Sequence, residues 1–299
     1  MNPRAQIRTL SDGRRLHLHD GPIDLIVEAF GSPGEIAAAH HAASERFVTV
    51  LDELCSELRF LRTQCSAESP WPRGSVARRM FAATLPYAGR HFITPMAAVA
   101  GAVAEEILGS MISASRLSRA YVNDGGDIAL HLAPGEQFVV GMVQRPDRFS
   151  LFGTMTLPAD HPVRGIATSG WRGRSFSLGI ADAVTVLADR AAAADAAATI
   201  IANAVALPGH PSIVRVPACE LAPDTDLGHR RVTQAVGELT PSEIDQALAG
   251  GMRMAEILRR MGLIRSAALH LRGQTCIVGT ASESSQIQPY ATERGLVHA

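Results

Sequence analysis

Residues 119–143 read RAYVNDGGDIALHLAPGEQFVVGMV, in which three apolar runs are separated by two short turns that contain glycine. Apolar runs of this length between Gly, Pro and Asp residues are typical of β-strands. The Asp-Gly and Pro-Gly pairs allow the chain to reverse tightly between neighbouring strands. The stretch therefore predicts a meander of antiparallel strands, from which the rest of the fold can be worked out in both directions along the chain.

Upstream of the meander, the sequence predicts two strands and two helices. Residues 14–31, RRLHLHDGPIDLIVEAFG, form strand-like apolar runs bounded by Gly and Pro. Ser32, Pro33 and Glu35 match the N-cap, the first-turn proline and the capping-box acid of a long helix with apolar residues at spacings of three and four up to Leu61. Thr94 and Pro95 repeat this start before a helix rich in small residues, 96–112.

Downstream, strand-like runs at 164–170 and 175–189 precede a helix over about 189–207, two short strands near 212–218 and 232–239, and a helix over 240–262. This order predicts a layered α+β protein. We expect one domain over residues 14–279, with any two subdomains meeting near 112–165. Residues 1–13 and 280–299 are expected to be mobile termini because they have little apolar patterning.

Composition excludes several classes of function. The 299 residues are 46% hydrophobic and 19% charged, unlike a disordered or fibrous chain. All 28 basic residues are arginine, which excludes a Schiff-base lysine and the usual P-loop. The net charge of −1 offers no electrostatic basis for binding nucleic acid or an anionic membrane. No run of consecutive apolar residues approaches the roughly 18 to 20 that a membrane-spanning helix requires, and we expect a cytoplasmic protein. We also expect its four cysteines to be free and its ligand to be a small molecule.

Two segments carry carboxylates that suit ligand chemistry. The turn at 123–127 (NDGGD) has paired glycines, which let backbone N–H groups approach a ligand, and aspartates that can accept from ligand hydroxyls; an ordinary hairpin turn is the alternative. Asp195 and Thr199 lie four residues apart on one helix face, where a carboxylate and a hydroxyl could hold Mg²⁺. The alternative is a helix-start aspartate with a threonine bonded to the backbone.

Two further segments favour anion binding. Residues 167–177 (ATSGWRGRSFS) alternate glycines, hydroxyls and the guanidiniums of Arg172 and Arg174, which suits phosphate or carboxylate capture; a solvated basic loop is the alternative. The helix start after Thr94 presents N–H groups and a positive dipole end to an anion, as any capped helix would. The histidines at 17, 19, 40 and 41 have no third ligand at a helpful spacing, so we expect no metal there.

Taken in order, these segments resemble the ApbE superfamily, the FAD:protein FMN transferases, and more closely a bacterial branch of uncharacterised ApbE-like proteins. The resemblance to the branch spans about Gly13 to Leu271. It is carried by GPIDLI, ITPMAAVAGAVAEEIL, YVNDGGDIALHLAPGE, RGIATSGWRGRSFSLGIADAVTVLA and ADAAATIIANAV. The resemblance to the transferases themselves covers the GGD turn, the ATSG loop and the D-x-x-x-T helix.

The resemblance implies two α+β units, with antiparallel sheets packed by helices around a central flavin-sized cleft. It implies FAD as the ligand and Mg²⁺ as the metal, with Asp195, Thr199 and a backbone carbonyl near Ala100 as metal ligands. The residues expected to contact the flavin nucleotide are polar groups and glycines of the same segments. They are Thr94, Asn123, Gly125, Gly126, Thr168, Ser169, Gly170, Arg172, Ser175 and Ser177.

The chain departs from the transferase pattern at two places. It reads AAVAGA where the transferases have G-G-I-A-K-G, and SFSLGIAD where they have H-I-I-D-P-x-T-G. Three functions therefore stay open. The first is metal-assisted flavin transfer or pyrophosphate cleavage, with Asp127 as general base and Arg174 or Arg172 stabilising phosphate charge. The second is a flavin-dependent redox enzyme or its partner subunit, and the third is a ligand carrier without catalysis. An acceptor or redox partner protein would accompany the first two, and homo-oligomerisation is compatible with all three.

Overall fold

The computed structural model describes residues 4–143, 151–279 and 287–289, and within them one antiparallel sheet of nine strands organises the fold. Its strand order is β1-β2-β3-β4-β5-β8-β9-β12-β13, and every neighbouring pair is antiparallel. The strands are β1 (Gln6–Thr9), β2 (Leu16–Asp20), β3 (Ile23–Phe30), β4 (Arg119–Asp124), β5 (Asp127–Leu132), β8 (Gly165–Ser169), β9 (Ala183–Ala188), β12 (Ser266–Leu271) and β13 (Gln274–Val278). The expected layered α+β fold with antiparallel sheets is confirmed, and the strands before and after residue 150 share this one sheet.

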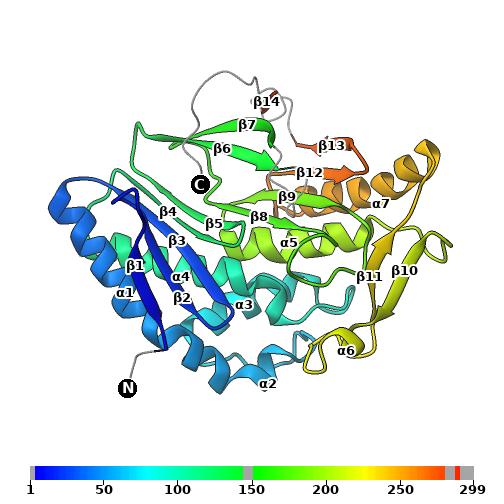
Figure 1. Ribbon diagram of the computed structural model, residues 1–299, viewed down its shortest axis with the longest axis horizontal. Helices are drawn as coiled ribbons and strands as arrows, with labels where there is room; N and C mark the ends of the chain where they lie inside the picture. The colour runs from blue at the N-terminus through cyan, green and yellow to red at the C-terminus, as the bar shows by residue number, and fades with distance from the viewer. Residues whose placement is uncertain (1–3, 144–150, 280–286, 290–299) are drawn as a thin grey trace.

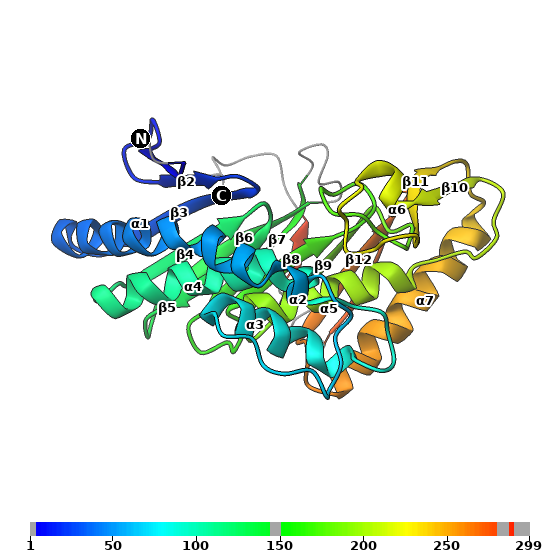
Figure 2. The ribbon, with the colours of Figure 1, turned by 90° about the horizontal axis from the view of Figure 1, so that it is seen from below.

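Helices cover one face of this sheet (Figure 1; Figure 2 shows them from below). They are α1 (Pro33–Ser56), α2 (Leu58–Leu61), α3 (Ser75–Thr84), α4 (Val99–Ala114), α5 (Ala191–Ala204) and α7 (Pro241–Arg260), with 3-10 turns η1 (Leu85–Tyr87) and η2 (Pro95–Ala98). The core beneath the sheet includes fully buried Phe47, Phe81, Met80, Ile107 and Ile201. At one end, β10 (Ile213–Pro217) and β11 (Arg231–Val236) form a two-stranded sheet that flanks α6 (Ala218–Leu221).

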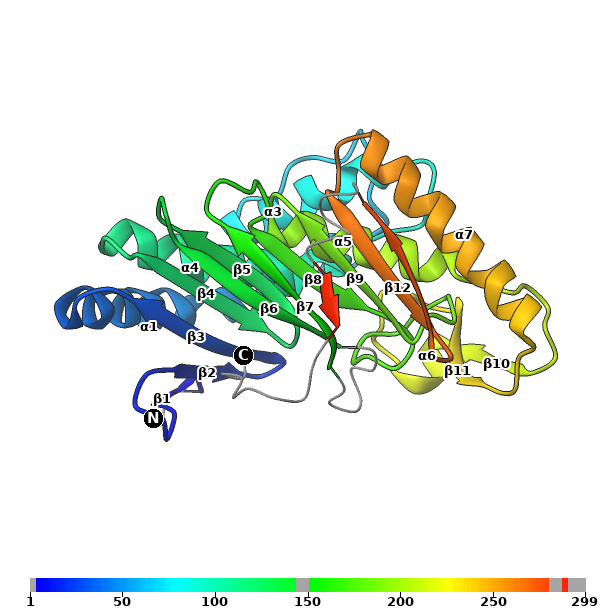
Figure 3. The ribbon, with the colours of Figure 1, turned by 90° about the horizontal axis from the view of Figure 1, so that it is seen from above.

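A small sheet, in the order β14-β7-β6, lies over the other face of the main sheet (Figure 3). Its strands are β6 (Gln137–Val143), β7 (Leu151–Pro158) and β14 (Ile287–Pro289). A second apolar cluster joins the layers, with Met155 and Leu157 of β7 packed near Tyr121, Leu130 and Ile166 of the main sheet. The third strand of the expected meander, β6, therefore leaves the main sheet, because β8 occupies the free edge of β5.

Of the two capping signals in the sequence, the structure shows the one at α1. Ser32 accepts from the N–H of Glu35 while the Glu35 carboxylate accepts from the N–H of Ser32, which is a complete capping box at α1. The expectation for Thr94 differs from the structure. Its hydroxyl donates to the Asp226 carboxylate instead of capping a helix, and the chain makes the 3-10 turn η2 before α4 begins.

The termini differ from the expectation in the part that the structure describes. Residues 6–9, expected in a mobile terminus, form edge strand β1 against β2, because main-chain hydrogen bonds hold an edge strand even where its side chains are exposed. Residues 287–289 form β14, while 280–286 and 290–299 lie outside the described residues. The strands β7, β12 and β13 and the helix α3 were not predicted.

The segment Pro95–Ala114 is long and apolar enough to cross a membrane by length and composition alone. Core helices pass the same test. In this structure the segment packs against α1, α3, α5 and the strands β4 and β5.

Candidate functional site

A cavity of about 910 Å³ lies between the main sheet and the small sheet, within the size range of small-molecule sites. One end is polar and is formed by the β4–β5 turn, the end of β8, the loop after it and the first turns of α4 and α5. The middle and the other end are largely apolar and aromatic. The apolar lining consists of Phe30, Tyr121, Ile128, Leu130, Phe138, Val139, Val140, Met155, Leu157, Ile166 and Leu187.

The polar end exists because β5 and β8 pair over only a short length. Their register partners are Ile128 with Ile166 and Ala129 with Gly165. Beyond these pairs, a side-chain hydrogen bond takes the place of the main-chain hydrogen bonds between the strands: Asp127 Oδ1 accepts from the N–H of Thr168 at 3.1 Å. The two strands are thus held by a carboxylate at this point, and Asp195 and Thr199 of α5 line the same cavity from the helix side.

Asp127 and Asp195 are two partly buried carboxylates that line the cavity. Burial raises the pKa of Asp195 to about 7, although the N–H groups of Ala100 and Gly101 act in the opposite direction. Burial, followed by the charge of Asp195, raises the pKa of Asp127 well above its usual range. Burial also raises the pKa of neighbouring Asp124 to about 7. Negative charge is therefore costly at this end, and a bound cation would relieve the repulsion.

Reciprocal contacts between α4 and α5 fix the position of Asp195. Neither helix has a side-chain cap of its own. Asp195 Oδ2 accepts from the N–H of Gly101 in the first turn of α4 at 3.1 Å, and Glu105 Oε1 of α4 accepts from the N–H of Ala192 in the first turn of α5 at 2.9 Å. Each helix therefore supplies the carboxylate that satisfies free N–H groups at the start of the other.

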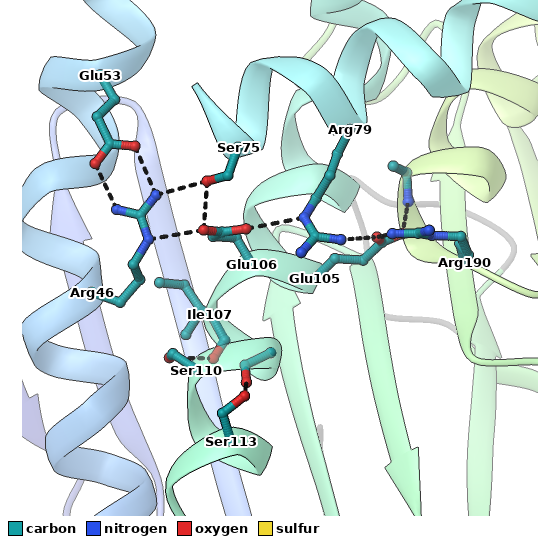
Figure 4. Close-up of polar contacts among 12 residues, drawn as sticks. Arg46, Glu53, Ser75, Arg79, Glu105, Glu106, Ile107, Ser110, Ser113 and Arg190 are labelled. Atoms are coloured by element: carbon teal, nitrogen blue, oxygen red, sulfur yellow. Dashed lines mark hydrogen bonds and ion pairs between the residues drawn. The ribbon is translucent and has the colours of Figure 1, made fainter. Parts of the chain in front are cut away.

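An ion-pair network secures this junction from the far side (Figure 4). Glu105 also accepts from Arg190 at 2.7 Å and lies 3.4 Å from Arg79. Arg79 continues to Glu106 at 3.0 Å, and Glu106 accepts from Arg46 of α1 at 2.9 Å. The helices α1, α3, α4 and the start of α5 are thus tied together by charged side chains directly behind the acidic pair.

The glycine turn carries Arg174 above it. Gly125 has φ +64°, and a Cβ there would collide with the Arg174 guanidinium. Gly126 has φ +113°, and its N–H donates to Asn123 Oδ1 at 2.8 Å. The Arg174 side chain is 64% exposed, and its Nη2 lies 3.7 Å from Asp124 Oδ1. The turn is therefore a hairpin turn that also forms a wall of the cavity, and the long, cationic Arg174 side chain lies across it.

Arg172, expected to capture phosphate, is held by a protein carboxylate. Its Nε donates to Asp182 Oδ1 at 2.6 Å, and its guanidinium lies over the Trp171 ring, 4.3 Å from the centroid. Asp182 is buried and also accepts from Trp171 Nε1 and the N–H of Arg272. Arg172 therefore lines the cavity while it pairs with a buried carboxylate, a partner that no sequence pattern indicated.

Most residues singled out in the sequence lie in this one cavity, although they come from positions spread between Ala100 and Thr199 along the chain. Those that line it are Ala100, Asn123, Gly125, Gly126, Asp127, Thr168, Ser169, Gly170, Arg172, Arg174, Ser175, Asp195 and Thr199. Thr94 and Ser177 do not line it: Thr94 binds Asp226, and the buried Ser177 hydroxyl lies against Asn203 and the N–H of Gly179. The chemical roles assigned to the lining residues stay predictions.

The donor set at the acidic end fits a hard divalent cation in part. Asp127, Asp195 and the Thr199 hydroxyl supply oxygen donors, which Mg²⁺ prefers. Ala100 lines the cavity in the first turn of α4 with its N–H facing Asp195, and the expected carbonyl ligand from this region stays a prediction. Among the described residues no group of three or more His, Cys, Asp or Glu side chains could hold a metal alone. Further oxygens would have to come from a ligand.

Sequence reasoning missed the opposite end of the cavity. Glu28 and Tyr121, register partners in β3 and β4, both line it and are 2% and 6% exposed. Phe138 packs edge-on against Phe30 and Tyr121, and Arg119 lies over the Phe30 ring. The only sequence signal was Glu28 at an alternate position of an otherwise apolar strand, IDLIVEAF.

Comparison with known proteins shows the family of the chain. The family model described as "AbpE bacteria" matches residues 7–277. The chain belongs to that family. This confirms the ApbE-like bacterial family indicated by the sequence motifs.

Named relatives are archaeal UPF0280 proteins. The relative from Methanosarcina acetivorans is 32% identical over 184 residues, which cover 61% of this chain and 70% of that protein. The relative from Methanococcoides burtonii is 37% identical over 151 residues, 50% of this chain and 58% of that protein. The chain thus matches less than two thirds of the latter's length.

Among solved structures, the flavin transferase ApbE from Vibrio cholerae aligns with a TM-score of 0.49 and 11% identity. The alignment covers 94% of this chain and 99% of that one. The apo flavinyl transferase ApbE from Pseudomonas stutzeri aligns with a TM-score of 0.46 and 9% identity, covering 94% and 96% of the two chains.

Proposed function

We propose that the cavity binds a flavin nucleotide, with FAD as the fullest occupant, and that its phosphates lie at the acidic end with a divalent cation. The observation that carries this proposal is the partly buried pair Asp127 and Asp195, both with raised pKa values, at one end of a slot whose middle is apolar and aromatic. A heteroaromatic ring suits the slot between the two sheets. A phosphate group alone would be repelled by the carboxylates, so the ligand requires a cation to share their charge.

The start of α4 supports an anion at the same end. Ala100 lines the cavity in the first turn of this helix, where the positive end of the helix dipole favours an anion, although its N–H and that of Gly101 face Asp195. When bound, Mg²⁺ would neutralise phosphate charge between the two aspartates and the Thr199 hydroxyl. The proposal thus accounts for a cavity end that combines unfavourable carboxylate repulsion with a favourable helix start.

The same residues could support transfer of the FMN moiety or cleavage of the FAD pyrophosphate. A hydroxyl oxygen of an acceptor protein, or of water, would form a bond to the flavin-side phosphorus while the bridging P–O bond breaks and AMP leaves. Asp127 would take the hydroxyl proton, since its raised pKa makes the carboxylate a stronger base. Arg174, lying over the Gly125 turn, would stabilise charge on the departing phosphate.

Binding without transfer is the second candidate, and one observation favours it. Arg172 is committed to Asp182, which leaves Arg174 as the one arginine of the 167–177 loop directed over the β4–β5 turn. A redox enzyme or a carrier needs flavin held at the site and no phosphate-directed cation beyond what binding requires. This reading predicts a protein that purifies with stoichiometric flavin and releases no AMP.

Titration calorimetry with FAD, with and without Mg²⁺, tests the binding proposal, and chromatography of the same mixtures measures AMP. We expect FAD to bind more tightly with Mg²⁺ than in EDTA, and Asp195→Asn to remove that difference. The matched control is Asp245→Asn, on the exposed face of α7, which should behave as wild type. Equal FAD affinity with and without Mg²⁺ in wild type would contradict a cation-dependent site.

A further inference from the structure

The end of the cavity opposite the acidic pair holds two neighbouring buried polar groups whose hydrogen-bonding capacity is not filled by the protein. Glu28 Oε1 and the Tyr121 hydroxyl are both buried, and neither has a hydrogen-bond partner among the residues that the structure describes. Arg14 forms a longer ion pair with this carboxylate, with its Nε 3.7 Å from Oε1, and the Arg14 side chain is 58% exposed. That separation is beyond hydrogen-bond range.

These groups are placed side by side by the sheet. Glu28 and Tyr121 are register partners in the β3–β4 pair, so their side chains leave the same face of the sheet with Cβ atoms about 5 Å apart. Both side chains line the cavity. Burial and the charge of Glu28 raise the pKa of Tyr121, so the phenol stays protonated and offers a donor beside a carboxylate acceptor.

The two polar groups lie at a useful distance from the phosphate end. Tyr121 is four residues before Gly125 along β4, which is about 13 Å at the rise of an antiparallel strand. Between them the floor is apolar, with Ile128, Leu130 and Ile166, and the roof is formed by Phe138 and Met155. A planar ring in this slot would therefore present its outer edge to Glu28 and Tyr121.

We propose that Glu28 and Tyr121 form a ring-edge subsite that selects heteroaromatic ligands whose edge carries an N–H donor beside an acceptor. This inference rests on the proposed nucleotide-binding function. The pyrimidine edge of a flavin has such an N–H between two carbonyl groups, and the adenine edge has an amine beside a ring nitrogen. Glu28 accepts from the N–H and Tyr121 donates to the neighbouring acceptor. A ligand ring without the donor leaves the buried carboxylate unsatisfied and is rejected.

The test compares ligands that differ by one donor, measured by calorimetry with Mg²⁺ on wild type, Glu28→Leu and Tyr121→Phe. The flavin arm uses FMN against its N3-methyl derivative, and the adenine arm uses AMP against purine riboside 5′-monophosphate, which lacks the amine. We expect wild type to prefer the donor-bearing member of one arm by about tenfold to a hundredfold, the range for a hydrogen bond to a charged group. Glu28→Leu should abolish that preference, and Tyr121→Phe should weaken the same ligand about tenfold. The arm that shows the preference identifies which ring occupies the slot.

Thermal unfolding separates this subsite from a structural role. Because Glu28 is buried without a hydrogen bond at Oε1, Glu28→Leu should leave the midpoint unchanged or higher, and Tyr121→Phe keeps the packing on Phe138. Glu45→Gln, an exposed glutamate on α1, is the matched control. A lowered midpoint in both cavity variants, or variants that bind and discriminate as wild type does, would overturn the subsite while FMN or FAD binding still supported the proposed function. A wild-type protein that binds none of these nucleotides would remove both.

Discussion

At the residue scale, the acidic pair decides what the cavity can hold. Asp127 and Asp195 are brought together from a turn and a helix, and both are partly buried with raised pKa values. Each also accepts a backbone N–H, from Thr168 and Gly101 respectively, so each has a structural task in addition to any role toward a ligand. Removing the charge and keeping the shape is therefore the informative substitution.

Asp195→Asn should change how stability depends on pH. In the folded protein the pKa of Asp195 is raised from 3.8 to about 7, so the folded state binds more protons than the unfolded state between these values. In the wild type, the contribution of Asp195 to the free energy of unfolding is fully present below about pH 4 and is lost as the pH rises to about 7. The loss corresponds to about 4 kcal/mol at most. Thermal unfolding should show the variant gaining several degrees over wild type at pH 8 and little at pH 4. If the difference in unfolding midpoint between variant and wild type is the same at pH 4 and pH 8, the pKa of Asp195 is not raised in the folded protein.

The two arginines of the 167–177 loop should respond oppositely to truncation. Arg172→Ala removes the cationic partner of the buried Asp182 carboxylate and should lower the free energy of unfolding by about 3 kcal/mol. Arg174→Ala should leave stability unchanged because this side chain is exposed, yet reduce AMP release about a hundredfold to a thousandfold if transfer occurs. Urea unfolding and AMP chromatography measure the two effects. An equal stability loss in both variants would show that Arg174 is a structural residue.

At the element scale, the site depends on how closely α4 and α5 approach. A Cβ on Gly101 would collide with the backbone of Ala191 and Ala192, so only glycine allows the start of α4 to meet the start of α5. The contact is what lets the N–H of Gly101 reach Asp195 and Glu105 reach Ala192. The position of the acidic pair is thus a property of the helix junction as much as of α5 itself.

Gly101→Ala should therefore destabilise the protein although alanine favours helices. We expect a loss of about 1–3 kcal/mol from the forced backbone shift. The control is Gly109→Ala on the same helix, where nothing lies within 4 Å of the added Cβ, and it should gain about 0.5–1 kcal/mol. Chemical denaturation measures both. If the two substitutions shift the midpoint in the same direction, the close approach at Gly101 is not what positions the junction.

How much the sequence could predict depended on whether the signal was local. The Ser32–Glu35 capping box and the Gly125–Gly126 turn are written in adjacent residues, and both form as expected. Thr94 carried the same kind of local signal, but a distant partner, Asp226, took its hydroxyl. Pairing of Arg172 with Asp182 and of Glu28 with Tyr121 depends on tertiary geometry, which periodicity does not contain.

At the scale of the whole molecule, the cavity is bounded by two sheets, between which the described residues form no strand pairing. The main sheet is anchored to the helical layer, while β6 and β7 are joined to it by one small apolar cluster. Nearly all polar residues of the acidic end belong to the main sheet and the helices, whereas the roof of the slot is β6 and β7. A ligand between the layers would contact both and would add to the few contacts that hold them together.

Ligand binding should consequently stabilise the small sheet more than any other part of the molecule. With FAD and Mg²⁺ at about a hundred times the dissociation constant, openings that require ligand release are disfavoured by about 2.7 kcal/mol, or roughly a hundredfold slower exchange. Hydrogen–deuterium exchange should show this protection in β6, β7 and the β4–β5 turn. The β10–β11 sheet, at the far end of the molecule and outside the cavity lining, is the internal control and should not change. Because β6 and β7 reach the main sheet through side chains alone, protection there requires an occupant between the layers. Protection confined to the helices, with calorimetric binding intact, would place the ligand elsewhere.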